Sequence, residues 1–193
     1  MHDIIFEDEH FDKVDFAIAP LQKGQYDNCR FAACHLANAN LTDFLFVDCM
    51  FDGCDLSNAH LANTAFRDVR FVNCKMIGLR FELCNSFGLA VLFEMCNLSY
   101  SSFYGTKLKK TIFRHVVLHE ADLTEADLTE AVLEHSDLRD AKFENTNLAK
   151  ADLRTSKNYS IDPEINHIKK ARFGLSGIAG LLEKYDIDID MKH

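Results

Sequence analysis

A large apolar residue returns every five positions along most of the chain, and a small residue stands two positions before each one. The clearest stretch has its large residues at Leu123, Leu128, Leu133, Leu138 and Phe143. A helix face repeats about every 3.6 residues and a flat strand about every 2, so neither explains a period of five. Residues two apart in an extended segment point to the same side, so the chain must turn once per repeat. The pattern predicts an all-β solenoid that coils around its own apolar core.

The large residues fall into two runs. The first extends from Phe6 to Phe81 and the second from Phe93 to Leu153, both in steps of five. The step from Phe81 to Phe93 is twelve residues, which predicts a bulge or small corner loop within residues 82–92. In the first run, residues twenty positions apart are alike. One aromatic column contains Phe6, Tyr26, Phe46 and Phe66, and a second contains Phe11, Phe31, Phe51 and Phe71. A period of twenty means four repeats per coil and therefore a four-sided cross-section.

The end of the chain departs from the repeat. We expect a single domain over residues 1–193, with the β-helix at 4–155, an irregular last coil at 156–175 and a C-terminal helix and tail at 176–193. Ser176 is a candidate N-cap for a short helix. A cap is needed because the end of a solenoid exposes its core and unpaired strand edges.

The tail has more apolar residues than one capping helix needs. Ile178, Leu181, Leu182 and Tyr185 have the spacing of one helix face, and the residues after them alternate between apolar and acidic. An apolar face on a terminal strand favours a partner, and a two-fold arrangement is the commonest closed one. We therefore expect a homodimer through the C-terminal end. Its predicted cap and interface residues are Leu181, Leu182, Tyr185, Ile187, Ile189 and Met191.

A motif of the form A(D/N)LXX recurs near the end of the repeats. It reads ADLTE at 121–125 and 126–130, SDLRD at 136–140, TNLAK at 146–150 and ADLRT at 151–155. These motifs resemble the pentapeptide repeat family over roughly residues 4–155, and the resemblance implies a right-handed quadrilateral β-helix. More loosely, the tail resembles the ends of the Qnr quinolone-resistance proteins and related topoisomerase-protecting proteins, in which a short C-terminal helix helps to form a dimer. The partner implied by this second resemblance is a type II topoisomerase such as DNA gyrase.

Negative charge is concentrated in one part of the chain. Residues 119–153 contain 10 acidic and 3 basic side chains, a net charge of −7, whereas the whole chain carries −9. This local charge density approaches that of B-DNA, which carries one charge per about 1.7 Å. We expect an acidic binding face formed by Glu120, Glu125, Glu130, Glu134, Asp140 and Glu144. The alternative is a solvated surface that only keeps a repeat protein soluble. The acidic excess argues against direct binding of nucleic acid.

The candidate chemistry is sparse. All seven cysteines occupy the small position two residues before a centre, which predicts free, buried thiols rather than disulfides or metal ligands. The nine histidines form no short metal-binding pair, and no nucleotide-binding or hydrolase motif is present. We therefore expect no enzyme activity, no metal and no cofactor.

The sequence predicts a cytoplasmic protein. It begins without a signal peptide pattern and contains no apolar stretch long enough to span a membrane.

Three functions remain open. The first is a non-enzymatic, protein-binding β-helix that presents an acidic, DNA-like surface to a DNA-binding protein. The second is a structural or adaptor protein without DNA mimicry, and the third is an enzyme with a dispersed site.

Overall fold

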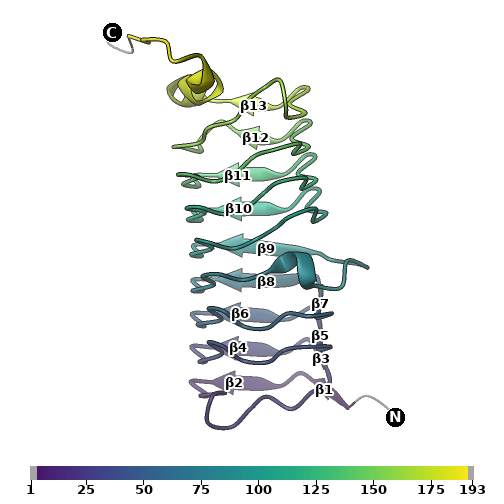
Figure 1. Ribbon diagram of the computed structural model, residues 1–193. Coiled ribbons are helices and arrows are strands. Elements are labelled where there is room, and N and C mark those ends of the chain that lie inside the picture. The colour runs from purple at the N-terminus through teal and green to yellow at the C-terminus, as the bar shows by residue number, and fades with distance from the viewer. Residues whose placement is uncertain (1–3, 191–193) are drawn as a thin grey trace.

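The computed structural model describes residues 4–190, which form a straight rod of stacked coils (Figure 1). Strands of successive coils pair in parallel, and residues twenty apart are direct partners, as Phe6 is of Tyr26 and Phe31 is of Phe51. The expected fold class is confirmed: the chain is an all-β solenoid, a right-handed quadrilateral β-helix with a short C-terminal helix. We name the four sides of the coil faces A, B, C and D, in the chain order of their first central residues, Phe6, Phe11, Phe16 and Leu21.

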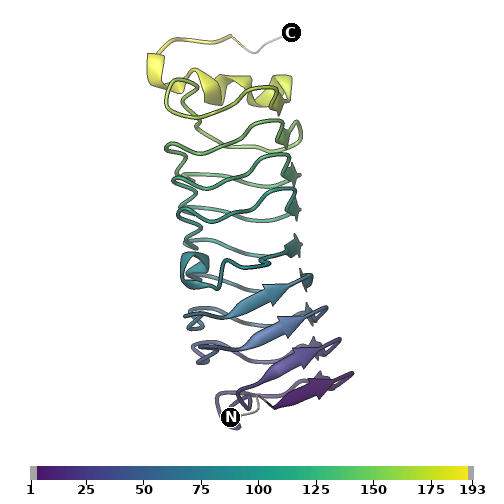
Figure 2. The same ribbon diagram turned by 90° about the vertical axis from the view of Figure 1, so that its right-hand side faces the viewer.

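Two faces carry the strands. Face A has a four-stranded sheet that is confined to the N-terminal half of the rod (Figure 2). Its strands are β1 (Ile5–Glu7), β3 (Gln25–Asp27), β5 (Leu45–Val47) and β7 (Ala65–Arg67). Face B has a nine-stranded sheet along the whole rod. Its strands are β2 (His10–Asp12), β4 (Arg30–Ala32), β6 (Met50–Asp52), β8 (Val69–Val72), β9 (Val91–Glu94), β10 (Ile112–Arg114), β11 (Val132–Glu134), β12 (Asp152–Leu153) and β13 (Arg172–Phe173). On faces C and D, successive coils are joined by isolated parallel bridges, such as the bridge between Asp15 and His35.

The core consists of the central residues and of the small residues two positions before them. Phe51 is fully buried, and its ring stacks between Phe31 at 4.5 Å and Phe71 at 5.1 Å. Rings of face A meet those of face B edge to face, as Phe46 meets Phe51. The aromatic columns predicted from the period of twenty are therefore continuous stacks in the core.

Most corners are closed by a residue in the left-handed conformation, two positions after a centre. Glu120, Glu125 and Glu130 are examples, with φ of 53°, 58° and 60°. The Asp or Asn that precedes the centre supports the turn, since Asp122 Oδ1 accepts a hydrogen bond from the Thr124 amide at 3.0 Å. Corner side chains point to solvent, so the charge of each corner residue is displayed along one edge of the rod.

The expected irregularity lies where the spacing predicted it. A 3₁₀ turn, η1 (Phe81–Leu83), is followed by a loop at 84–90 that projects from the rod between β8 and β9 (Figure 1). Phe71 pairs with Phe93, so the two extra residues are absorbed before face B resumes. Cys84 belongs to this broken repeat and is only half-buried, which corrects the expectation that all seven thiols are buried. All seven are free, and the other six are buried.

The C-terminal end is covered by a helix, as expected, but it is a 3₁₀ helix. It comprises η2 (Leu175–Leu181) and η3 (Glu183–Tyr185), and it begins after Gly174 without a side-chain cap, so Ser176 is not the N-cap. Gly177 and Gly180 lie against Tyr159, where any side chain would clash, and the Ile161 amide bonds the Gly180 carbonyl at 2.8 Å. The sheet of face B continues to the start of this helix, because Phe173 pairs with Leu153.

The 3₁₀ geometry changes which residues cover the core. Leu181 is buried and Ile178 packs against the last coil, but Tyr185 is 51% exposed. Three residues per turn place i and i+3 on one face, so a residue seven positions on no longer shares it. Ile187 and Ile189 follow in an extended segment without a strand, and Met191 lies outside the described residues. Within residues 4–190, no helix is long and apolar enough to cross a membrane.

Candidate functional site

Four of the six predicted acidic residues gather around face D of two successive coils. Glu120 and Asp140 lie one above the other at the corner between faces C and D, because the Glu120 amide bonds the Arg139 carbonyl at 2.9 Å. Glu125 lies at the opposite corner, between faces D and A, and its amide bonds the carbonyl of Glu144 at 2.8 Å. All four side chains are exposed.

Asp122 joins the four. It occupies the middle of face D, in a ladder of bridges that runs from Ser102 through Asp122 to Lys142. We call the five residues Glu120, Asp122, Glu125, Asp140 and Glu144 the acidic face. Lys142 lies within it and reduces its net charge to −4.

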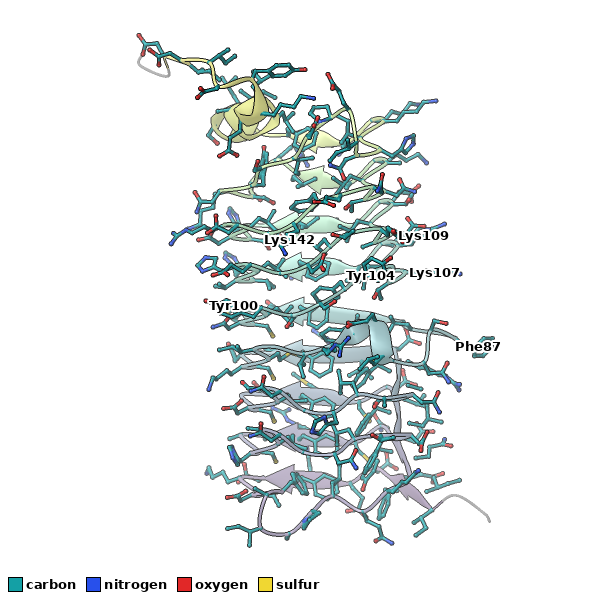
Figure 3. The ribbon with its side chains drawn as sticks, viewed as in Figure 1. Phe87, Tyr100, Tyr104, Lys107, Lys109 and Lys142 are labelled. Carbon is teal, nitrogen blue, oxygen red and sulfur yellow. The ribbon has the colours of Figure 1, made fainter. Side chains whose placement is uncertain are left out.

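Two exposed tyrosines border the acidic face on the preceding coil. Figure 3 looks onto face D, with Tyr100 at one edge, Tyr104 and Lys142 between, and Lys107 and Lys109 at the other edge. Tyr100 is 60% exposed and Tyr104 is 47% exposed. A hydrogen bond to Glu120, and the negative charge of that group, raise the pKa of Tyr100; Glu125 raises the pKa of Tyr104 in the same way. The site therefore combines clustered carboxylates with aromatic side chains.

The other two predicted residues lie elsewhere, so the expected single face of six is corrected. Glu130 is at the corner between faces A and B, where Lys150 Nζ lies 2.7 Å from its carboxylate. Glu134 is on face B and pairs with Arg114 at 2.8 Å. These hydrogen bonds and opposite charges lower the pKa of both carboxyls. The six predicted residues do not share one face because residues five positions apart lie on different faces of the coil, and only residues about twenty apart are stacked.

Asp122, Tyr100 and Tyr104 were not predicted, although the signal for them was present. All three are placed by the period of twenty once the register slip is taken into account: Tyr100 stacks below Glu120, and Tyr104 follows the central Phe103 of face D. Sorting surface residues by face, as the core residues were sorted, would have found them.

The predicted cap and interface residues divide into two groups. Leu181 is buried in the cap, whereas Leu182 and Ile189 are half-buried and Ile187 is 55% exposed. The Tyr185 hydroxyl donates a hydrogen bond to Glu164 Oε1 at 2.9 Å. A groove of about 450 Å³ lies between the helix and the extended tail, and its lining includes Leu182, Ile187 and Ile189.

The buried cysteine thiols have a structural role. Cysteine thiols hydrogen-bond carbonyls of the preceding coil, as Cys54 Sγ does to the Phe31 carbonyl at 3.3 Å. Burial raises the pKa of Cys49 to about 12, so this thiol stays protonated at neutral pH. Within residues 4–190, no three His, Cys, Asp or Glu side chains are grouped so that they could hold a metal ion.

The fold is shared with solved structures. Two trypsin-treated variants of QnrB1, described as a plasmid-mediated fluoroquinolone resistance protein, align over 98% of this chain and 99% of theirs. Their TM-scores are 0.65 and 0.62, at 19% and 18% identity. HetL, a pentapeptide repeat protein involved in heterocyst differentiation regulation from the cyanobacterium Nostoc sp. strain PCC 7120, is 17% identical and has a TM-score of 0.43 over 90% of this chain and 84% of its own.

No curated protein sequence matches the chain. Two family models do: a pentapeptide repeat region matches residues 45–111, and pentapeptide repeats in eight copies match residues 27–61, 96–134 and 117–154. Together these matches extend from residue 27 to residue 154, within the stretch of coils that the structure shows. The chain belongs to the pentapeptide repeat family.

Proposed function

We propose that this protein is a non-enzymatic, protein-binding β-helix whose acidic face binds a DNA-binding protein. One observation carries the proposal: Glu120, Asp122, Glu125, Asp140 and Glu144, from two coils, gather around one face and its two corners, whereas the nearby Glu130 and Glu134 are ion-paired elsewhere on the coil. A rigid solenoid holds such charges in fixed positions, so a partner meets them without first ordering a flexible segment.

The spacing of the charges suits a partner that normally holds DNA. Successive coils are about 4.8 Å apart, so two coils and their edges occupy roughly 10 Å of the rod. B-DNA of that length carries about six phosphate charges. The acidic face carries five carboxylates and one lysine. A basic groove built for a duplex would therefore meet a comparable local charge.

The partner that we propose is a type II topoisomerase, with DNA gyrase as the first candidate. The resemblance of the tail to Qnr proteins points to it, and the fold that the chain shares with QnrB1 supports it. Since DNA gyrase acts on the chromosome, the proposed compartment is the cytoplasm. The proposed role needs no nucleic acid bound to this chain and no cofactor.

A gyrase supercoiling assay with and without the purified protein tests the proposal. We expect the protein to change supercoiling or its inhibition by a fluoroquinolone, and to compete with DNA for the enzyme. The variant Glu120→Gln, Glu125→Gln, Asp140→Asn, Glu144→Gln should lose this effect. Because the interaction is electrostatic, its strength should also fall as salt is raised.

A matched control removes four charges from another part of the rod. Glu7, Asp8, Asp48 and Asp68 are exposed on face A and its corner with face B, in the N-terminal half. Their amide variant has the same net charge as the acidic-face variant and should keep full activity. Equal loss in both variants would show a general charge effect. No effect of the unaltered protein on gyrase would leave the structural or adaptor role.

We further propose that two copies associate through the C-terminal end. The groove beside Leu182, Ile187 and Ile189 is partly apolar and partly open, and Tyr185 is exposed beside it. A second copy related by a two-fold axis would cover the same residues on both chains. The acidic faces lie close to this end, so the pair would display one longer acidic surface.

A further inference from the structure

A hollow lies at the register slip. It has a volume of about 170 Å³ and lies between η1, the loop at 84–90 and the next coil. Its lining includes Glu82, Cys84, Leu89, Tyr104 and Lys107. The hollow is at the edge between faces D and A, next to the labelled Tyr104 and Lys107 in Figure 3.

Glu82 in the wall of this hollow has an unsatisfied carboxylate. Its Oε1 accepts a hydrogen bond from Arg80 Nε at 2.7 Å, but its Oε2 is shielded from solvent and has no hydrogen-bond partner within residues 4–190. The side chain is only 15% exposed. A shielded carboxylate oxygen without a donor is unfavourable, so a cationic donor that reaches it would relieve a cost already present in the free protein.

The rest of the wall suits the stem of a long basic side chain. Leu89 is apolar and packs against the core, and the Tyr104 ring is 47% exposed. Lysine and arginine bury their methylene groups against such surfaces, and aromatic rings attract their charged ends. The chain has such a contact beside the hollow, where the Arg67 guanidinium lies 5.6 Å from the centre of the Phe87 ring.

The hollow lies on the same side of the rod as the acidic face. Glu82 follows the central Phe81 of face D, and one coil later Tyr104 follows Phe103, since Arg80 and Ser102 are bridge partners. Two coils beyond Tyr104, Glu144 takes the equivalent position in the acidic face. A protein lying along face D would therefore reach both.

We propose that the hollow is a specificity pocket that takes one lysine or arginine side chain of the protein partner, with its cationic end at the Glu82 carboxylate, whose Oε2 a small rotation of the side chain would turn into the hollow. This inference rests on the proposed function for the identity of the partner, but not for the chemistry of the pocket. Distributed carboxylates attract a basic surface without selecting among basic proteins, whereas one side chain seated in a unique pocket fixes the register of the partner on the rod.

Two further side chains in the wall of the hollow, Cys84 and Lys107, bear on what it can bind. Burial, together with the charge of Glu82, raises the pKa of Cys84 to about 12, so this thiol reacts only slowly at neutral pH. Lys107 lines the hollow and has no ion pair in the part of the chain that the structure describes. It is the chain's own cation at the rim and would compete with, or repel, an incoming one.

The test uses the full chain and small probes rather than the partner. N-acetyl-lysine methylamide and N-acetyl-arginine methylamide are titrated into isotope-labelled protein, and backbone amide shifts are followed by NMR. We expect saturable shifts at residues 81–89 and 104–107 with millimolar affinity, as for a single small ligand. The neutral isostere N-acetyl-norleucine methylamide should bind at least ten times more weakly. Equal binding of the neutral probe, or no shift at these residues with either cation, would overturn the pocket.

Matched variants locate the contact. Glu82→Gln should lose the preference for the cationic probes. Glu94→Gln is the control, because Glu94 also follows a central phenylalanine, is 25% exposed in its side chain and lies on face B of the next half-coil. Lys107→Met should bind the cations as tightly as the unaltered chain or more tightly, and weaker binding would contradict the pocket.

The acidic-face variant with four amides separates the two proposals. If the pocket exists, that variant should still bind the lysine probe, whatever its effect on gyrase. Loss of probe binding in Glu82→Gln alone would support the pocket even if gyrase is not the partner. Retained cation preference in Glu82→Gln would overturn the pocket and leave the acidic face as proposed.

Discussion

Phe71 and Phe93 are twenty-two residues apart in the sequence, yet they are direct partners in the sheet of face B, with their rings stacked at 5.5 Å. The neighbouring stacks, such as Phe51 on Phe71, join residues twenty apart. The two extra residues lie in the loop at 84–90, so the core column continues unbroken past the slip. An insertion in a solenoid is tolerated when it lies at a corner or loop and leaves the inward positions in register.

Deleting Phe87 and Gly88 should therefore leave the fold intact. Phe87 is 77% exposed, and the deletion would restore steps of five from Phe81 to Phe93. We expect an unchanged circular dichroism spectrum and a thermal midpoint within a few degrees of the unaltered chain. Deleting Asp140 and Ala141 instead should prevent folding, because every later centre would leave the core. A large loss of stability in the first deletion would show that the loop supports the coils.

Phe51→Ala should be among the most destabilising core substitutions. The ring is fully buried and stacked on both sides, so its removal leaves a cavity that flanking rings cannot fill without breaking their own stacks. The free energy of unfolding should fall by about 3–5 kcal/mol in chemical denaturation. The exposed Phe87→Ala serves as a control and should change it by less than about 0.5 kcal/mol. A cost below about 1 kcal/mol for Phe51→Ala would contradict the stacked core.

The cysteines should differ in their rate of labelling. Cys84 is half-buried in the broken repeat, whereas the remaining six are buried. With a thiol reagent at neutral pH, we expect slow modification of the native protein, with Cys84 modified first, and modification of all seven on unfolding. Mass spectrometry of the labelled peptides identifies the order. Rapid native labelling of Cys34, Cys54 or Cys74 would be inconsistent with their place in the core.

Asp137 should stabilise the fold at neutral pH and lose this effect in acid. Burial alone would raise its pKa, but a hydrogen bond from Asn158 and the neighbouring side chains of His119 and Lys157 lower it from 3.8 to about 2. A lowered pKa in the folded state means that the stabilisation is present above pH 3.8 and is lost as the pH falls through about 2. Asp137→Asn should reduce the free energy of unfolding by roughly 1–2 kcal/mol at pH 7.

The difference in the free energy of unfolding between Asp137→Asn and the unaltered chain should narrow continuously as the pH is lowered toward 2. Urea unfolding at each pH measures this difference. Asp48→Asn is the control, since Asp48 is at an exposed corner without an ion pair in residues 4–190. A gap that stays constant from pH 7 to pH 2 would show that the effect of Asp137 is not electrostatic.

The homodimer can be tested without removing the cap. Truncation after residue 175 should abolish the dimer, but it also removes the buried Leu181 and exposes the last coil. Leu182→Asp with Ile187→Asp is the sharper variant, because it changes the groove and leaves Leu181 in place. In sedimentation velocity at micromolar concentration, we expect a dimer that tightens with salt, as repulsion between the acidic faces is screened. The double variant should sediment as a monomer; a monomer for the unaltered chain would refute the interface.

The five-residue period determined the coil and its core, and the period of twenty among the central residues determined its four sides. Each centre has to point inward, and a chain with apolar residues at every fifth position can bury them all only by turning once per repeat. For this reason Phe6, Phe51 and Leu133 were assigned correctly without coordinates, and the step of twelve after Phe81 located the loop. The last coil was also predictable, since Phe173 keeps the register.

The tertiary structure decided what lies on the surface and at the ends. Glu120 and Glu130 look alike in the sequence, but one borders face D and the other is held by Lys150 at another corner, because a half-turn of the coil separates them. The capping helix is of the 3₁₀ type, and its Gly177 and Gly180 lie in close contact with Tyr159, a contact between segments that no local pattern shows. The shielded oxygen of Glu82 likewise arises only where the slip brings η1, the loop and the next coil together. Local periodicity specifies inward positions, since burial dominates their energy, whereas the neighbours of an outward side chain depend on how separate coils are stacked.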